Sequence, residues 1–221
     1  MPGPEPTASP DPPALAAAFP APPNGAGRAR IVGGRGARLV GDEGIWFFIA
    51  GDLCLFTVCF LLFMSGRMDA PAQFERSRET LHLGLGLVNT LVLLSSSYFM
   101  ARAVVASRHH FRAHVVRNLS LALGIGAIFA VVKVFEYGSK FKVGISPVTN
   151  DFFMYYFVLT GLHLLHYLGG MVALLVTLVR ARESKLDAGY THWIESVGVY
   201  WHMVDLIWIF LFPMLYLLRA S

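Results

Sequence analysis

Nine ionisable side chains lie inside long apolar stretches of the chain, where they stand out chemically. Five are acidic or basic and four are histidines: Asp52, Lys133, Glu136, Glu195, Asp205, His82, His163, His166 and His202. A charge in hydrocarbon is costly, so groups of this kind normally face the interior of a helix bundle and pair with one another. Proton relays, metal sites and hydrogen bonds between helices all use these residue types. Their spacing must therefore discriminate among these roles.

Two of the apolar stretches carry polar residues at helical spacing. His163 and His166 are three residues apart and hence on one face of a helix. Glu195, His202 and Asp205 fall within about 80° of one another on a helix that turns about 100° per residue. We expect one polar seam on each helix. Neither a cysteine thiolate nor a dense carboxylate cluster accompanies these residues, so the sequence predicts no metal site and no catalytic residue in this chain.

The other acidic and basic groups suggest roles of their own. Lys133 and Glu136 are three residues apart and can form an ion pair on one helical face. Their position near a helix end would let both side chains also reach lipid headgroups. Asp52 has no basic residue on its own helix, so it could be neutral and donate a hydrogen bond to another helix. The alternative for Asp52 is a proton-handling or lipid-facing role.

Five apolar stretches must position these groups, each near or above the roughly 20 residues that cross a bilayer. They are residues 44–64, 81–105, 115–137, 152–179 and 194–218. The 221-residue chain is 55% hydrophobic and only 14% charged, whereas an average soluble domain has about 25% charged residues. The sequence therefore predicts an all-α polytopic membrane protein in which residues 41–221 form a bundle of five transmembrane helices.

The amino-terminal segment and the distribution of basic residues indicate the domain organisation and the orientation in the membrane. Nine of the twelve prolines fall within residues 1–23, which predicts that residues 1–40 form a disordered arm. Lys and Arg number eleven on the side of the amino terminus and six on the other side. This bias predicts a bacterial cytoplasmic membrane protein with its amino terminus in the cytoplasm and its carboxyl terminus outside. The net charge of +4 comes without aromatic-interleaved basic runs, so no nucleic-acid partner is expected.

Four segments together resemble subunit III of the haem-copper oxidases, the cytochrome c oxidase family. They are ESVGVYWHMVDLIWIFLFPMLYLL, FFMYYFVLTGLHLLHYLGG, LVNTLVLLSSSYFMARA and KVFEYGSKF, which occur in the order of the family. The resemblance covers residues 43–219. It is to a short form, because the common form has seven helices. Asp52 stands where the family usually has glutamate and Lys133 where many members have glutamine, and both features look like the NorE-type accessory protein of nitric oxide reductase.

The resemblance implies a non-catalytic subunit of a respiratory electron-transport complex. The haem and copper would reside in the catalytic subunit I and in subunit II. This chain would stabilise subunit I, hold phospholipids and support proton uptake. Lipid-headgroup contact and hydrogen bonding between helices are the implied roles of Glu136, His163, His166, Glu195, His202 and Asp205, and Asp52 matches the buried carboxylate of the first shared helix.

Two alternatives come from other functional classes. The first is a membrane electron carrier with b-type haem, using His82, His163, His166 or His202 as ligands. The second is a small proton-coupled carrier built on Asp52 and on the pair of Lys133 and Glu136. An odd number of helices without an evident internal repeat argues against the carrier.

Overall fold

Helices make up all of the regular secondary structure in the described part of the computed structural model, which covers residues 42–183 and 186–218. They are α2 (Glu43–Asp69), α3 (Pro71–Glu79), α4 (Leu83–Arg108), α5 (Arg112–Lys142), α6 (Asp151–Glu183) and α7 (Ala188–Phe212), followed by a single π-helical turn, η1 (Pro213–Leu217). No strand occurs in these two ranges, and the predicted all-α fold is confirmed. The predicted arm, residues 1–40, lies outside the described residues.

Five helices have the length and apolar character to cross a membrane: α2, α4, α5, α6, and α7 together with η1. Each begins or ends a few residues away from the predicted span. For example, α5 covers 112–142 where the hydropathy predicted 115–137. The reason is that hydropathy marks the hydrocarbon core, whereas a helix of 31 residues is about 46 Å long and continues through the headgroup layer.

The connection between the first two spans is largely helical, although the sequence indicated only a charged break at residues 65–80. α2 continues to Asp69, and α3 then begins at Pro71, where the missing N–H group of proline is not needed. Phe74 anchors α3, since its ring centroid lies 5.4 Å from that of Phe63 and 5.6 Å from that of Phe152. The charged residues of α3 hide it from a hydropathy search.

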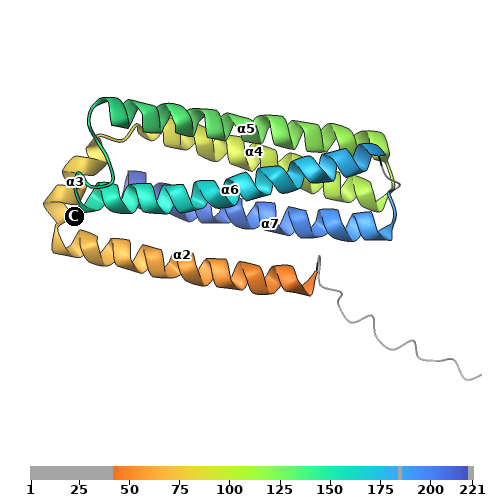
Figure 1. Ribbon diagram of the computed structural model, residues 1–221, viewed down its shortest axis with the longest axis horizontal. Coiled ribbons are helices and arrows are strands. Elements are labelled where there is room, and N and C mark those ends of the chain that lie inside the picture. Colours follow the sequence, from red (N-terminus) through yellow and green to blue (C-terminus); the bar gives the residue numbers. More distant parts are fainter. Residues whose placement is uncertain (1–41, 184–185, 219–221) are drawn as a thin grey trace, which may run out of the picture. The chain divides into compact units, whose positions relative to one another are not determined.

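Four of the helices form a closed ring, and the fifth packs outside it. α4 contacts α5, α5 contacts α6, α6 contacts α7, and α7 contacts α4 again. α2 lies along the side of the ring formed by α6 and α7 (Figure 1). We call the two ends of the bundle the α3 end, where α2 ends and η1 lies, and the opposite end, where α2 and α7 begin.

Close packing in the ring depends on two glycines. A Cβ atom on Gly170 of α6 would lie 2.7 Å from Cε3 of Trp201 on α7. A Cβ atom on Gly86 of α4 would lie 2.6 Å from Cε2 of Phe212. Real Cβ atoms do not approach other atoms this closely, so the absence of a side chain at both positions lets large aromatic rings of α7 lie against the neighbouring helices.

Two arginines at the α3 end hold the carboxyl-terminal end of the last helix. Arg67 donates a hydrogen bond to the carbonyl oxygen of Leu218 at 2.9 Å, and Arg78 donates one to that of Tyr216 at 3.2 Å. The last carbonyls of a helix lack partners within the helix and carry partial negative charge. Arg78 also hydrogen-bonds Glu75, which raises the pKa of the Arg78 guanidinium. These contacts connect α2 and α3 to η1.

Replacing Arg78 with glutamine is expected to lower the free energy of unfolding by about 1 kcal/mol, because the Tyr216 carbonyl and Glu75 both lose a charged partner. The measurement is the unfolding midpoint of the purified protein in detergent. Arg76→Gln is the matched control, since Arg76 is exposed on the same helix. Equal shifts in the two variants would contradict the role given to Arg78.

Candidate functional site in the polar contacts between helices

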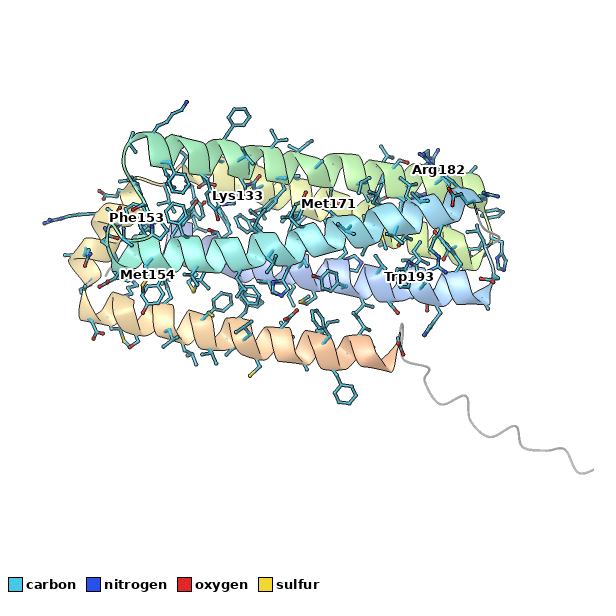
Figure 2. The ribbon with its side chains drawn as sticks, in the orientation of Figure 1. Lys133, Phe153, Met154, Met171, Arg182 and Trp193 are labelled. Atoms are coloured by element: carbon cyan, nitrogen blue, oxygen red, sulfur yellow. The ribbon has the colours of Figure 1, made fainter. Side chains whose placement is uncertain are left out.

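A buried ion pair lies inside the ring toward the α3 end. Lys133 Nζ lies 2.8 Å from Glu136 Oε2, and the two side chains are 1% and 0% exposed. The Tyr216 hydroxyl donates a hydrogen bond to Glu136 Oε1 at 2.6 Å and accepts one from Lys133 Nζ at 3.3 Å. The pair therefore connects α5 to η1, and Figure 2 shows Lys133 on α5 in this half of the bundle.

Aromatic rings surround the cation of this pair. Lys133 Nζ lies 4.7 Å from the ring centroid of Trp208 and 5.7 Å from that of Tyr156. Lys140, only 4% exposed, places its Nζ 5.2 Å from the same Tyr156 ring. The faces of aromatic rings carry partial negative charge and attract such cations. The group formed by Lys133, Glu136, Lys140, Tyr156 and Tyr216, which we call the α5 charge cluster, is enclosed by protein.

The position of Lys133 and Glu136 within α5 differs from the expected position near a helix end. α5 continues past Glu136 to Lys142, so the pair is not at the helix end. Both side chains are buried in the interior of the ring.

The two histidines of α6 contact different helices, so the expected single seam on this helix is wrong. His163 is fully buried between rings, with centroids 5.6 Å from Phe129 on α5 and 5.2 Å from Trp208 on α7. His166 contacts α2, where its Nε2 lies 3.3 Å from Asp52 Oδ1. A step of three residues rotates the side chain by about 60°. In a packed bundle this rotation is enough to place the two side chains against different neighbouring helices.

The contact between Asp52 and His166 holds a proton in either of two ways. His166 Nδ1 lies 2.8 Å from the carbonyl oxygen of Leu162, which can only accept, so Nδ1 carries a hydrogen. Nε2 then either accepts a proton from a neutral Asp52 or donates one to an ionised Asp52. Asp52 is mostly buried, and its carboxyl group connects α2 to α6.

The polar residues of α7 lie along its contact with α4. Glu195 Oε1 accepts a hydrogen bond from Arg108 Nε at 2.8 Å near the opposite end. Further along α7, His202 Nδ1 is hydrogen-bonded to the hydroxyl of Ser97, and Asp205 is buried three residues beyond His202. The seam thus holds α7 against α4.

The histidines considered as haem ligands have separate surroundings. His82 is exposed and directly precedes α4 at the α3 end. His163 is enclosed by rings, His166 contacts α2, and His202 is an exposed residue of α7. In the two described ranges no group of three or more His, Cys, Asp or Glu side chains is placed to hold a metal ion.

Several partners of these groups were not found from the sequence. Tyr216 and Ser97 are ordinary members of apolar or small-residue runs, and Arg108 entered only the count of basic residues. Each lies 80 or more residues from the side chain that it contacts. No local spacing relates such residues, and only an alignment of relatives could have indicated them.

Comparison with known proteins places this arrangement in a family. The family model described as cytochrome c oxidase subunit III matches residues 40–220, which include every helix described above. The chain belongs to the cytochrome c oxidase subunit III family. It is therefore a subunit III of the haem-copper oxidases and a multi-pass membrane protein, as the four sequence segments indicated.

Relatives of this subunit III carry two kinds of oxidase name. Cytochrome c oxidase subunit 3 of Synechocystis sp. is 31% identical over 176 residues, which are 79% of this chain and 74% of that protein. The probable quinol oxidase subunit 3 of Staphylococcus aureus strain USA300 is 25% identical over 175 residues, 79% of this chain and 87% of that protein. The two names differ in the electron donor, which is cytochrome c in one and quinol in the other.

Proposed function

We propose that this chain is a non-catalytic subunit III of a haem-copper respiratory oxidase, in which it stabilises the catalytic subunit I and holds phospholipids. The family match over residues 40–220 carries the proposal. Haem and copper would belong to subunits I and II. The polar side chains of this chain support the assignment, since Glu136, His166 and Glu195 each contact another helical element of the same chain. Such contacts stabilise a bundle that can serve as a packing surface.

The charge distribution supports an amino terminus on the cytoplasmic side of a bacterial cytoplasmic membrane. The opposite end of the bundle carries Arg102, Arg108, Arg112, Arg117, Arg180 and Arg182. At the α3 end, Lys140 is buried and Arg67 and Arg78 are bonded to carbonyl groups of the last turn. The basic excess at the opposite end fits the cytoplasmic side. A carboxyl-terminal reporter that is active only in the cytoplasm should stay inactive.

The test of the main proposal is purification of the tagged chain in mild detergent from its own membranes. We expect a haem-bearing catalytic subunit to copurify and the complex to consume oxygen. Nitric oxide consumption instead would favour the accessory protein of nitric oxide reductase. A stable solitary chain without a partner would overturn the proposal. A haem absorption band in the isolated chain would support the b-type electron carrier.

We further propose that the contact between Asp52 and His166 supports proton uptake, because it holds an exchangeable proton inside the membrane region. Asp52→Asn should keep the hydrogen bond to His166 but cannot release the proton. We expect normal assembly and lower turnover, because the amide cannot pass the proton on. The measurement is the turnover of the purified complex.

The matched control for Asp52→Asn is Thr57→Val, an isosteric change on the exposed side of the same helix. This variant should retain wild-type turnover. Unchanged turnover of Asp52→Asn would show that Asp52 serves packing alone.

A further inference from the structure

An apolar groove lies on the outer surface between α5 and α6. Its volume is about 570 Å³, and its lining includes Ser120, Gly124 and Ala127 of α5 and Leu168, Val172 and Leu175 of α6. These three α6 side chains are about half exposed, so the groove is open along its length. Figure 2 shows Met171, another lining residue, at this junction of the two helices.

The floor of the groove at Gly124 is empty. A Cβ atom built on Gly124 would have no heavy atom within 4 Å, in contrast to Gly126 on the same helix, where Met171, Ser96 and Trp201 would lie within 3.4 Å. The hollow beside Gly124 therefore faces outward from the bundle. Ser120 is the one polar side chain in the lining of the groove, so in a membrane the hollow suits acyl chains.

Two arginines extend the walls of the groove toward the opposite end of the bundle. Arg117 precedes Ser120 by three residues and Gly124 by seven, so it lies on the same face of α5. On α6, Arg182 follows Leu178 by four residues and Leu175 by seven, again on one face. Both arginines are exposed, and Figure 2 shows Arg182 on the side of α6 nearest α5.

The register of the two antiparallel helices brings these arginines to the same level. Ring contacts pair Phe129 with Tyr167 near the middle and Phe141 with Phe157 at the α3 end. The sequence numbers of two facing residues, one on α5 and one on α6, therefore have nearly the same sum in both contacts. Continued to the opposite end, this register brings Arg117 and Arg182 to about the same level along the bundle.

Nearby charged groups have other partners, so Arg117 and Arg182 remain available to bind an anion. Arg108 is bonded to Glu195, and Arg180 lies 5.0 Å from the ring centroid of Trp193. Within residues 42–183 and 186–218, no ion pair includes Arg117 or Arg182. Glu183, the acidic neighbour, lies about 100° further round α6. The rim of the groove therefore has net positive charge.

We infer that this groove binds one anionic phospholipid, with an acyl chain in the apolar hollow and the phosphate between Arg117 and Arg182. The guanidinium group binds phosphate oxygens through two parallel hydrogen bonds. The proposed orientation sets the rim at the cytoplasmic leaflet, which is the leaflet where basic residues attract anionic lipids. The inference rests on the lipid-holding part of the proposed function and names the lipid class and its position.

The first test is native mass spectrometry of the whole complex, loaded with phosphatidylglycerol or with phosphatidylcholine. We expect one tightly retained phosphatidylglycerol and roughly fivefold weaker retention for each of Arg117→Gln and Arg182→Gln. Arg102→Gln is the control, since Arg102 lies at the same end on α4 and contacts Tyr98 instead. Equal retention of both lipids, unchanged by the two variants, would overturn the inference.

The second test fills the hollow without touching the arginines. Gly124→Leu should expel the lipid, because its side chain projects into the groove. Gly138→Leu, at an equally open position of the same helix outside the groove lining, should retain it. The amount of haem-bearing partner is measured in the same samples. If Gly124→Leu assembles normally and its lipid content is unchanged, the inference alone is contradicted. If the lipid is retained but no oxidase partner is present, the proposed function alone is contradicted.

A third test identifies the occupant directly. A photoreactive amino acid in place of Leu175, a half-exposed lining residue, should form an adduct with phospholipid in native membranes. An adduct with another protein chain would show that the groove is a subunit interface and would overturn the inference.

Discussion

Glu136→Ala should lower the free energy of unfolding by about 3–5 kcal/mol, the range measured when one partner of a buried ion pair is removed. Lys133 would remain in the interior without its carboxylate, since both side chains are buried. Tyr216 would also lose the acceptor at 2.6 Å that fixes its hydroxyl. Because the α5 charge cluster connects α5 with η1, we expect the last turn of the bundle to loosen as well. The measurement is denaturant or thermal unfolding of the purified complex in detergent.

A double-mutant cycle distinguishes a buried pair from two independent residues. Lys133→Met combined with Glu136→Leu should recover most of the lost stability, because apolar residues of similar volume replace a buried ion pair at little cost. The control is Glu75→Gln, which breaks the partly exposed pair with Arg78 and should cost about 1 kcal/mol or less. Additive losses in the double variant, or equal losses for Glu136→Ala and Glu75→Gln, would contradict the assigned burial.

Gly170→Val should destabilise the contact between α6 and α7 by about 3 kcal/mol, the upper part of the usual range for overpacked cores. The new side chain would begin 2.7 Å from Trp201, whose ring is fully buried. Trp201 cannot easily move aside, because the Tyr167 ring lies 5.7 Å away, centroid to centroid. We expect a lower unfolding midpoint and a smaller fraction of the subunit in the assembled oxidase.

Gly161→Val is the matched control for this substitution. Gly161 lies on the same helix, and a Cβ atom there would have no heavy atom within 4 Å. Both variants replace glycine by the same β-branched residue in a helix interior, so their intrinsic helix costs are similar. A loss of stability of the same size in both variants would show that close packing against Trp201 is not the cause.

Local sequence patterns determined the fold class and the approximate spans. Long apolar stretches require helices, because a chain in hydrocarbon must satisfy its backbone hydrogen bonds internally. The same reasoning missed α3, whose charged residues leave no apolar stretch, although Pro71 marks its start. The pairing of Lys133 with Glu136 was also accessible, since two residues three apart on one helix meet whatever surrounds them.

Packing between helices decided the rest of the site. The sequence alone could not show that His163 and His166 have different neighbours. The rotation of α6 in the bundle directs His163 toward α5 and α7 and His166 toward Asp52. Tyr216 meets Glu136 across 80 residues of chain, and the lining of the groove combines residues of α5 and α6 that are far apart in sequence. Helical periodicity fixes the face on which a residue lies. The neighbour of that face depends on the rotation and register of every helix in the bundle, which no local pattern encodes.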